Sequence, residues 1–500
     1  MKSEILLGVD LGTTVLKVAV FDSATGQVLA QAARRLPVTA RDDGAREQDW
    51  SQIERALDQA VVEVKKRLRK TWSRVSGIGL ASQAGSGIIV DRGSLRPLTP
   101  MILWNDARAA SHMDALVRKK PVRFWQKHTL RNVPSAGLGR LLWIRERLPR
   151  LLSASNIYVG AGEFLLFRLT GVWRQDAGSA LQNGCYNAVE ARLDQTLLDL
   201  AGVTADMVAP LRQGHELHSL TRDAARRLGL GEGIPVAGPY FDQEAGYLSS
   251  LGSTSRPMQC SLGTAWVGNF ALPERYQGGS PFQIVVPNPS GDGRLVVQPL
   301  LTGNVSWDWV LQHLIHKNIE KALERTKPLF EQLLLPPNGL VAIPWLTQTN
   351  PFCAESFGAG VFIGLSTGNS RDDLVRATAA GLAFEFARVF DGVKSAQVVD
   401  GLVLTGGASK GKCFQLLFSA LMAPLPVFVQ TEDLAPARGA IYAFSPKAAQ
   451  APVRCVRRPA KTGLERIAHQ FSLYRRIFDQ LYRNVPGAGA YEVGNAERRK

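Results

Sequence analysis

A carboxylate, a glycine and two threonines follow an apolar stretch close to the N-terminus, in the order Asp10-Leu11-Gly12-Thr13-Thr14. Glycine lets the backbone approach an anion closely, and successive N–H groups of such a turn can bind phosphate. An aspartate oxygen is also a ligand that Mg²⁺ prefers. The turn therefore indicates either a phosphate and metal site or a hairpin with only a structural role, and both interpretations stay open on these residues alone.

Two more glycine turns follow apolar strands later in the chain. Gly263-Thr264 lies in the segment LGTA at 262–265, which repeats the LGTT of 11–14, and Gly406-Gly407-Ala408 follows the apolar residues 401–405. Ser409 is a suitable N-cap for a helix that we expect to run to about residue 422. Three such turns predict a nucleotide site, in which two hairpins hold the phosphates and the third turn contacts the adenosine or its α-phosphate.

The elements that must position these turns are strands mixed with helices from the start of the chain, which predicts an α/β fold. Apolar residues at three- and four-residue spacing predict a helix over 53–68. Alternating or continuous apolar runs predict strands at 5–9, 16–21, 27–31, 77–81, 87–90, 259–262, 265–270, 401–405 and 426–429, the first three as an antiparallel meander.

The length of 500 residues indicates several domains. The Ser- and Gly-rich sequence SSLGSTS suggests a boundary near residue 250. We therefore expect one domain over 1–250, a second over 251–450 and a basic C-terminal extension over 451–500.

Longer motifs in the same order are similar to those of a known family. They are GVDLGTTVLKVAVFD at 8–22, REQDW at 46–50, IGLASQAGSGIIVD at 78–91, MILWNDARA at 101–109, RLLWIRE at 140–146, LTG at 169–171, GPYFDQEAG at 238–246, SLGTAWVG at 261–268 and GLVLTGGASKGK at 401–412. Over roughly residues 5–445 the chain resembles the FGGY carbohydrate kinases, within the actin, sugar kinase and Hsp70 ATPase superfamily. The WNDxR motif and the Asp-Gln pair before the second glycine turn distinguish this family from actin and Hsp70.

The resemblance implies two actin-like (ribonuclease H-like) ATPase domains with a cleft between them, and ATP-dependent phosphorylation of a sugar or polyol hydroxyl. Asp242 matches the general base and Asp10 the aspartate associated with Mg²⁺. Gly12, Thr13 and Thr14 match the first phosphate hairpin, and Gly263 with Thr264 the second. Lys17 matches a position that is often basic in the family, or is an exposed strand cation.

The resemblance also implies a set of sugar contacts, and a polyol needs converging donors and acceptors beside an apolar wall. The matching residues are Gln83, Trp104, Asn105, Asp106, Arg108 and Gln243, together with Asp242. Trp104 is either that wall or a core tryptophan. Arg108 is either a sugar contact or a structural partner of Asp106.

The chain departs from common family patterns in two places. Ala84-Gly85-Ser86 replaces the Met-His-Gly typical of xylulokinases and the Arg-Glu-Thr typical of glycerol kinases, and the stretch 344–351 lacks the usual Gly-Glu-Arg. We expect a xylulose-like ketose as the leading acceptor. Glycerol, gluconate and a deoxyketose are alternatives, and a non-catalytic sugar- or nucleotide-binding regulator is the rival from another class.

The net charge of +16 resides in two segments, 118–150 with ten basic residues and one acidic residue, and 451–500 with eleven and four. Because neither carries a phosphate or base motif, we expect solvated basic faces rather than a nucleic-acid site. The five cysteines are widely spaced with no CxxC pair, and no apolar run reaches the roughly 18 residues of a membrane span. We therefore expect a cytoplasmic protein with a small-molecule substrate and no membrane partner, and the family leaves a homodimer open.

Overall fold

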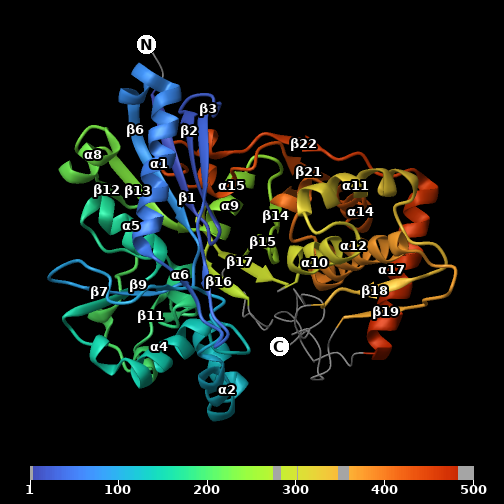
Figure 1. Ribbon diagram of the computed structural model, residues 1–500, viewed down its shortest axis with the longest axis horizontal. Helices are drawn as coiled ribbons and strands as arrows, with labels where there is room; N and C mark the ends of the chain where they lie inside the picture. Colours follow the sequence, from blue (N-terminus) through green and yellow to red (C-terminus); the bar gives the residue numbers. More distant parts are fainter. Residues whose placement is uncertain (1–3, 274–282, 301, 347–359, 482–500) are drawn as a thin grey trace.

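The structure is a computed structural model that describes residues 4–273, 283–300, 302–346 and 360–481. Its strands form two large mixed sheets, one built from residues before 242 and the other from residues after 256. Figure 1 shows the first set of elements on the left and most of the second on the right. In the described part of the chain, no helix combines the length and apolar character needed to cross a bilayer.

The first sheet has the strand order β12-β13-β6-β1-β2-β3. The expected meander is confirmed, because β1 (Ile5–Leu11), β2 (Val15–Asp22) and β3 (Val28–Arg35) pair antiparallel. β6 (Val75–Ser82) and β13 (Pro235–Phe241) run parallel to β1, and β12 (Leu217–Ser219) closes the edge antiparallel to β13. The carboxyl ends of β1, β6 and β13 therefore meet at one edge of the sheet.

Every residue of β1 is buried, so this strand needs cover on both faces. The predicted first helix is α1 (Trp50–Leu68), whose start is capped by Asp49 accepting the Ser51 N–H. Its apolar stripe shares one core with β1, β2 and β6. The opposite face is covered by a segment that comes more than 400 residues later.

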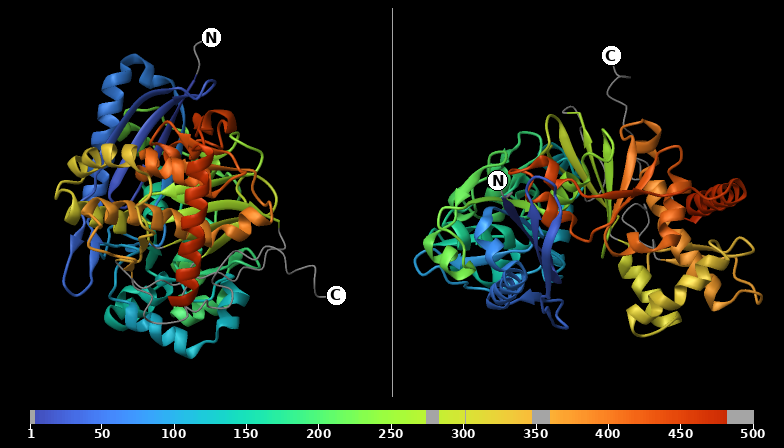
Figure 2. Two further views of the ribbon diagram at one scale, coloured as in Figure 1. Left: turned by 90° about the vertical axis from the view of Figure 1, so that its right-hand side faces the viewer. Right: turned by 90° about the horizontal axis from the view of Figure 1, so that it is seen from above.

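That segment contains α15 (Ala435–Gly439) and α16 (Pro446–Ala449). A Cβ at Gly8 would overlap the carbonyl oxygen of Ala437, so glycine is required for this close approach. The buried guanidinium of Arg438 donates hydrogen bonds to the carbonyl oxygens of Gly26 and Ala448. Residues 435–449 thus lie between β21 and β22 of the second sheet in sequence but pack on the first, and Figure 2 shows this segment between the two halves.

A largely helical region follows the short strands β7 (Ile88–Asp91) and β8 (Met101–Ile102) and has a core of its own. The helices of this core are α2 (Ala110–Lys119), α3 (Val122–Thr129), α4 (Ala136–Arg147) and α7 (Gln195–Ala201), whereas α5 (Ala161–Thr170) packs in the core of the first sheet and α6 (Ala177–Gln182) packs in the core of the second. Most basic residues of 118–150 are exposed on it, as expected, but Arg131 and Arg140 are buried. Those two cations belong to the interior and not to the solvated basic face.

The second sheet has the strand order β16-β17-β15-β14-β20-β21-β22. Its strands are β14 (Pro257–Leu262), β15 (Trp266–Leu272), β16 (Ile284–Pro287), β17 (Arg294–Pro299), β20 (Gly401–Thr405), β21 (Val427–Gln430) and β22 (Val453–Cys455). The predicted second hairpin is confirmed by the antiparallel pairing of β14 with β15, and β20 runs parallel to β14. The second hairpin and the third glycine turn therefore leave the same edge of this sheet.

α9 (Asp242–Ser250) follows β13 and ends the first half, and the helices of the second half are α10 (Asn304–Leu314), α11 (Ile319–Gln332), α12 (Arg371–Val389), α13 (Asp391–Ser395), α14 (Lys412–Leu421) and α17 (Lys461–Leu481). The expected N-cap role of Ser409 is wrong. A short 3₁₀ turn occupies Gly407–Lys410, where the Ser409 hydroxyl donates to the Gly406 carbonyl at 2.7 Å, and α14 begins only at Lys412.

The segment after residue 451 contributes to the second half. β22 extends the second sheet by pairing with β21. α17 packs on α12, where the Tyr474 hydroxyl donates to Glu385 at 2.7 Å. Residues 482–500 of the expected basic extension lie outside the described residues. The four cysteines of the described ranges are free thiols, as their spacing predicted.

Candidate active site

Two carboxylates, Asp10 buried and Asp242 half-buried, lie at the edge of the first sheet where its parallel strands end. Asp10 is the next-to-last residue of β1, and Asp242 is the first residue of α9, directly after β13. Burial raises the pKa of Asp10 to about 6, opposed by the nearby charge of Lys17. Burial, and then the charge of Asp10, raise the pKa of Asp242 to about 7. The two groups act on each other, so the sheet brings together residues that are 232 positions apart in the sequence.

Asp242 has the environment of a proton acceptor. Its Oδ1 atom is buried and has no hydrogen-bond partner among the described residues. A carboxylate with a pKa near neutrality can take a proton from a hydroxyl at neutral pH. Its unpartnered oxygen is a hydrogen-bond acceptor that is available to that hydroxyl.

A third carboxylate, which is buried and which we did not anticipate from the sequence, lies close to this pair. Asp176 caps α6 by accepting the Ser179 N–H at 2.8 Å, and its charge contributes to the raised pKa of Asp242. Behind it, Arg212 pairs with Glu244 of α9 at 2.6 Å. The signal available in the sequence was only an ordinary N-cap pattern, Asp followed by small residues.

The first glycine hairpin, Gly12 to Thr14, connects β1 to β2 beside Asp10. The Thr13 hydroxyl donates to Gln83 Oε1 at 2.9 Å and accepts from Trp104 Nε1 at 3.1 Å. Gln48 Nε2 donates to the Thr13 carbonyl at 2.7 Å. Two of the predicted sugar contacts are therefore bonded directly to the predicted phosphate hairpin.

The loop after Gln83 is held in place by Ser86 and by the buried side chain of Arg140, a residue that we did not select from the sequence. The Ser86 hydroxyl donates to Gln83 Oε1 at 2.9 Å and accepts the Trp104 N–H at 3.1 Å. The buried guanidinium of Arg140 donates to the carbonyl oxygen of Gly85 and, at 2.9 Å, to that of Leu103. Trp104 itself is 37% exposed, which excludes the core tryptophan and leaves its ring accessible as a wall.

The residues of the WNDxR motif make different kinds of contact in the structure. Arg108 binds Asp106 at 2.8 Å and Glu47 at 2.7 Å, and its guanidinium lies 4.5 Å from the ring centroid of Trp143. Although burial opposes it, this pairing holds the pKa of Asp106 below its usual range. All of these contacts are internal and hold the loop that carries Trp104, while the sugar-contact role of Asp106 and Arg108 stays a prediction. Asn105 is exposed.

Lys17 lies at the junction of the two halves. Its ammonium is 3.2 Å from the Asp433 carboxylate and 3.0 Å from the Asp433 carbonyl oxygen, in the loop between β21 and α15. Lys410 approaches the same carboxylate at 3.5 Å. Lys17 thus neighbours the first hairpin and ties it to the second half through this ion pair.

The second hairpin and the third glycine turn are in direct contact. Gly406 has a φ of +83°, and a Cβ there would lie 2.9 Å from the carbonyl of Leu262, just before Gly263. The first N–H groups of α10 donate to the hairpin, from Asn304 to the Gly263 carbonyl at 3.3 Å and from Val305 to the Thr264 carbonyl at 3.2 Å. Gly263, Thr264, Gly406 and Gly407 therefore form one backbone surface, with the side chain of Asn304 beside it.

Gln243 turns toward the second sheet. Its Oε1 atom accepts from Asn269 Nδ2 of β15 at 3.0 Å, and its side chain also lowers the pKa of the adjacent Asp242. This contact across the halves was not visible in the sequence, where Asn269 is one polar residue in an otherwise apolar strand.

The carboxylates suit a magnesium ion that is shared with phosphates. In the described ranges no three His, Cys, Asp or Glu side chains gather closely enough to hold a metal by themselves. Mg²⁺ in phosphoryl-transfer sites typically takes one or two carboxylates, with phosphate oxygens and water completing its shell. Asp10, at the end of β1 beside the first hairpin, has the donor and the position for this arrangement.

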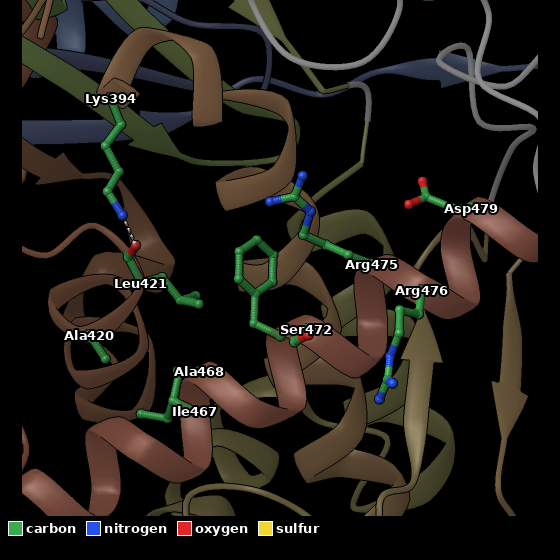
Figure 3. Close-up of a pocket in the computed structure, with 10 residues that line it drawn as sticks. Lys394, Ala420, Leu421, Ile467, Ala468, Ser472, Arg475, Arg476 and Asp479 are labelled. Atoms are coloured by element: carbon green, nitrogen blue, oxygen red, sulfur yellow. Dashed lines mark hydrogen bonds between the residues drawn. The ribbon is translucent and has the colours of Figure 1, made fainter. Parts of the chain in front are cut away.

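A separate cavity of about 450 Å³ lies in the second half. Figure 3 shows it between α17 and the ends of α13 and α14, with Ser472 and Arg475 on one side and Lys394 on the other. Lys394 Nζ donates to the Leu421 carbonyl at 2.9 Å, and Arg475 pairs with Asp391 at 3.4 Å. None of the predicted site residues lines this cavity, so we place the chemistry at the carboxylates and not here.

Comparison with solved structures agrees with the two-domain arrangement. The xylulose kinase from Rhodospirillum rubrum superposes with a TM-score of 0.82 at 20% identity, covering 95% of this chain and 99% of that one. The glycerol kinase of Plasmodium falciparum with ADP gives 0.79 at 16% identity, covering 96% and 98%. The fold is therefore the mixed α/β fold of these kinases, whose two domains are actin-like.

Comparison with known sequences identifies the family. The N-terminal domain of the FGGY family of carbohydrate kinases matches residues 5–249, and the C-terminal domain matches residues 260–445. A xylulose kinase from Bacillus subtilis is 23% identical over 96% of both chains, and an erythritol kinase from Brucella abortus is 25% identical over 88% of this chain and 86% of its own. The chain belongs to the FGGY family of carbohydrate kinases, which use ATP as the phosphate donor.

Proposed function

We propose that this kinase uses ATP with Mg²⁺ to phosphorylate a hydroxyl of a small sugar or polyol, with a xylulose-like ketose as the leading acceptor. The observation that carries the proposal is the pair of carboxylates, Asp10 and Asp242, which lie beside the first glycine hairpin and whose pKa values are both raised. Similarity to xylulose kinases supports the ketose, and similarity to erythritol and glycerol kinases keeps shorter polyols as the second class of acceptor.

Asp242 is the proposed general base. The acceptor hydroxyl binds to its free Oδ1, attacks the γ-phosphorus of ATP and passes its proton to the carboxylate as the bond to ADP breaks. Asp10 would hold the metal, which offsets the charge of the phosphates when bound. Gly12, Thr13 and Thr14 on one side and Gly263 and Thr264 on the other supply backbone N–H groups to those phosphates, while Gly406, Gly407 and Ala408 accommodate the nucleoside end.

The acceptor is proposed to lie between Gln83, Trp104, Gln243 and Asp242. Gln83 Nε2 supports this assignment, because it is a buried donor with no partner among the described residues. Asn105 is exposed nearby and remains a proposed contact. Asp106 and Arg108 contribute by shaping the loop that carries Trp104. The altered loop Ala84-Gly85-Ser86 makes its interactions inward, through Ser86, and Thr347 to Pro351 of the second departure lie outside the described residues.

The test is a panel of polyols, ketoses and sugar acids with ATP and Mg²⁺, read by ADP release, using the full chain and its Asp242→Asn variant. We expect turnover on at least one ketose or polyol, and a fall in kcat of about 10²–10⁴-fold in the variant with acceptor binding retained. Equal turnover in the variant would remove Asp242 as the base. ATP binding without turnover on any acceptor would favour the regulator.

A further inference from the structure

Four polar side chains form a continuous hydrogen-bonded chain between the two halves. Gln243 Oε1, in the first turn of α9, accepts from Asn269 Nδ2 at 3.0 Å. The same nitrogen donates to Gln259 Oε1, and Gln259 Nε2 donates to the Thr405 hydroxyl at 2.6 Å. The last three residues lie on the adjacent strands β15, β14 and β20. The chain of bonds therefore runs from the residue beside Asp242 to the residue before Gly406.

The direction of these bonds is fixed at the Thr405 end. The Thr405 hydroxyl donates to the carbonyl oxygen of Cys260 at 3.4 Å, and a carbonyl can only accept. Thr405 must then accept from the nitrogen of Gln259, which turns the oxygen of Gln259 toward Asn269. The Asn269 nitrogen therefore donates to two oxygens, one of Gln259 and one of Gln243. Because the Gln243 oxygen is used in this way, the amide nitrogen of Gln243 points to the other side, toward Asp242.

The effect on Asp242 agrees with this direction. Burial and the charge of Asp10 raise its pKa, whereas the backbone and the side chain of Gln243 lower it. A neighbouring N–H donor stabilises the charged carboxylate and lowers its pKa, while a carbonyl oxygen would do the opposite. Because the Gln243 oxygen is bound to Asn269, only the amide nitrogen of Gln243 is left to donate toward Asp242.

Keeping this network buried has a cost. Gln259, Asn269 and Thr405 are each at most 4% exposed, and Asn269 Oδ1 has no partner among the described residues. Gly246, one turn along α9, makes room for the network, because a Cβ there would lie 3.3 Å from Gln259 Nε2. Apolar side chains would fill the same space without an unsatisfied acceptor, so packing alone does not explain these amides.

We propose that Asn269 is a positioning residue of the phosphoryl-transfer site, which fixes the Gln243 amide with its N–H toward Asp242 and links that orientation to the strand ending at the nucleotide turn. The inference rests on the proposed role of Asp242 as the base. It assigns a function to a residue of the second half that touches neither acceptor nor nucleotide. Asp242 is then correctly held only while β14, β15 and β20 are docked against α9.

The experiment compares Asn269→Leu and Asn269→Asp in the full chain, on the acceptor with the highest turnover in the panel. We expect Asn269→Leu to lower kcat about tenfold, with the KM values for acceptor and ATP within about threefold of the wild type. The reason is that Gln243 loses the hydrogen bond that orients its amide but stays in the same position on α9. Asn269→Asp should lower kcat further, because a carboxylate only accepts and would turn the oxygen of Gln243 toward Asp242.

Gln430→Leu is the matched control. Gln430 is another buried amide of the second sheet bound to α9, but at its far end, where it donates to Ser249 Oγ at 3.1 Å. We expect this variant to lose thermal stability and to keep its kcat. Thr405→Val, which is nearly isosteric, should lower kcat in the same way as Asn269→Leu and carries the test if the Asn269 variants do not fold.

The outcomes separate the two proposals. If Asp242→Asn is inactive but Asn269→Leu and Thr405→Val keep the wild-type kcat, the positioning role is wrong and the base assignment stands. An equal loss of kcat in Gln430→Leu also overturns it, because the effect would then be general to the docking of α9. If Asp242→Asn is active, the base assignment fails and the positioning role fails with it.

Discussion

The two glycine hairpins have nearly the same sequence but are attached to different parts of the site. In the first hairpin the Thr13 side chain bonds to the Gln83 and Trp104 side chains. In the second the carbonyls of Gly263 and Thr264 accept backbone N–H groups of α10, and Gly406 abuts the preceding strand. The first is therefore connected to the acceptor side, and the second to the nucleotide side.

The surroundings also differ in charge. The first hairpin lies beside two carboxylates with raised pKa values, whereas the second is held by backbone and amide groups. The shared turn sequence thus determines which backbone N–H groups are available to a phosphate. The residues packed around each turn determine which other groups change when a ligand binds. Each prediction below disturbs one side and asks whether the other side changes.

The largest effect is expected on stability at the carboxylate side. The pKa of Asp242 rises from its ordinary 3.8 to about 7, so ionisation opposes folding and stability falls as pH rises between those values. Asp242→Asn should be more stable than the wild type by roughly 2–4 kcal/mol at pH 8, with the difference vanishing near pH 4. Urea unfolding from pH 4 to 8 measures it, and a gap that does not depend on pH would contradict the buried charge as its cause.

The next effect is expected at the nucleotide side. Gly406→Ala places a Cβ against Leu262 at a positive φ, a strain of about 1–3 kcal/mol. We expect the Kd for ATP to rise roughly tenfold to a hundredfold, while acceptor binding measured without nucleotide stays within about twofold. Calorimetry with each ligand separates the two. If the Kd for the acceptor rose by the same factor as the Kd for ATP, acceptor binding would depend on the turn at Gly406 and the two sides of the site would not be independent.

Thr13→Val tests the connection to the acceptor side. The substitution removes the hydroxyl that joins Gln83 to Trp104, so we expect kcat/KM for the acceptor to fall about tenfold. The Kd for ATP should rise less than in Thr264→Val, its counterpart in the other hairpin. If both valine variants affect acceptor and nucleotide equally, the contrast between the hairpins is wrong.

The smallest effect is expected for Trp104→Phe. Phenylalanine keeps an aromatic wall but cannot donate to Thr13, which removes one partly exposed hydrogen bond of 3.1 Å. We expect the acceptor KM to rise about threefold with kcat for saturating acceptor nearly unchanged. Trp104→Ala, which removes the wall as well, should have a clearly larger effect, and equal values for the two would remove the ring from the acceptor site.

Much of the fold could be predicted because the signals are local. β1, β2 and the hairpin between them follow from continuous apolar runs interrupted by Asp10 to Thr14, and α1 from its three- and four-residue spacing. The start of α14 was predicted two residues too early, because Ser409 satisfies a carbonyl of its own turn instead of capping a helix.

The parts that could not be predicted depend on partners that are distant in the sequence. Arg140 looks like one more cation of a basic stretch until its guanidinium is found under the loops at Gly85 and Leu103. Gly8 looks like any strand glycine until Ala437 is packed on it. The contacts of Arg108 with Glu47 and Trp143 likewise exist only in the folded chain.

The sequence by itself determined the turn chemistry, the family resemblance and the identities of Asp10 and Asp242, because residue type and local spacing specify which backbone shapes and functional groups are available. Only the tertiary structure decided that the charge of Asp10 acts on Asp242, that both carboxyls have raised pKa values, and that Asn269 reaches Gln243 across the halves. Electrostatic interactions and hydrogen bonds depend on distance and burial in space. These quantities are set by how β1, β13 and the second sheet pack, and no local pattern of residues contains them.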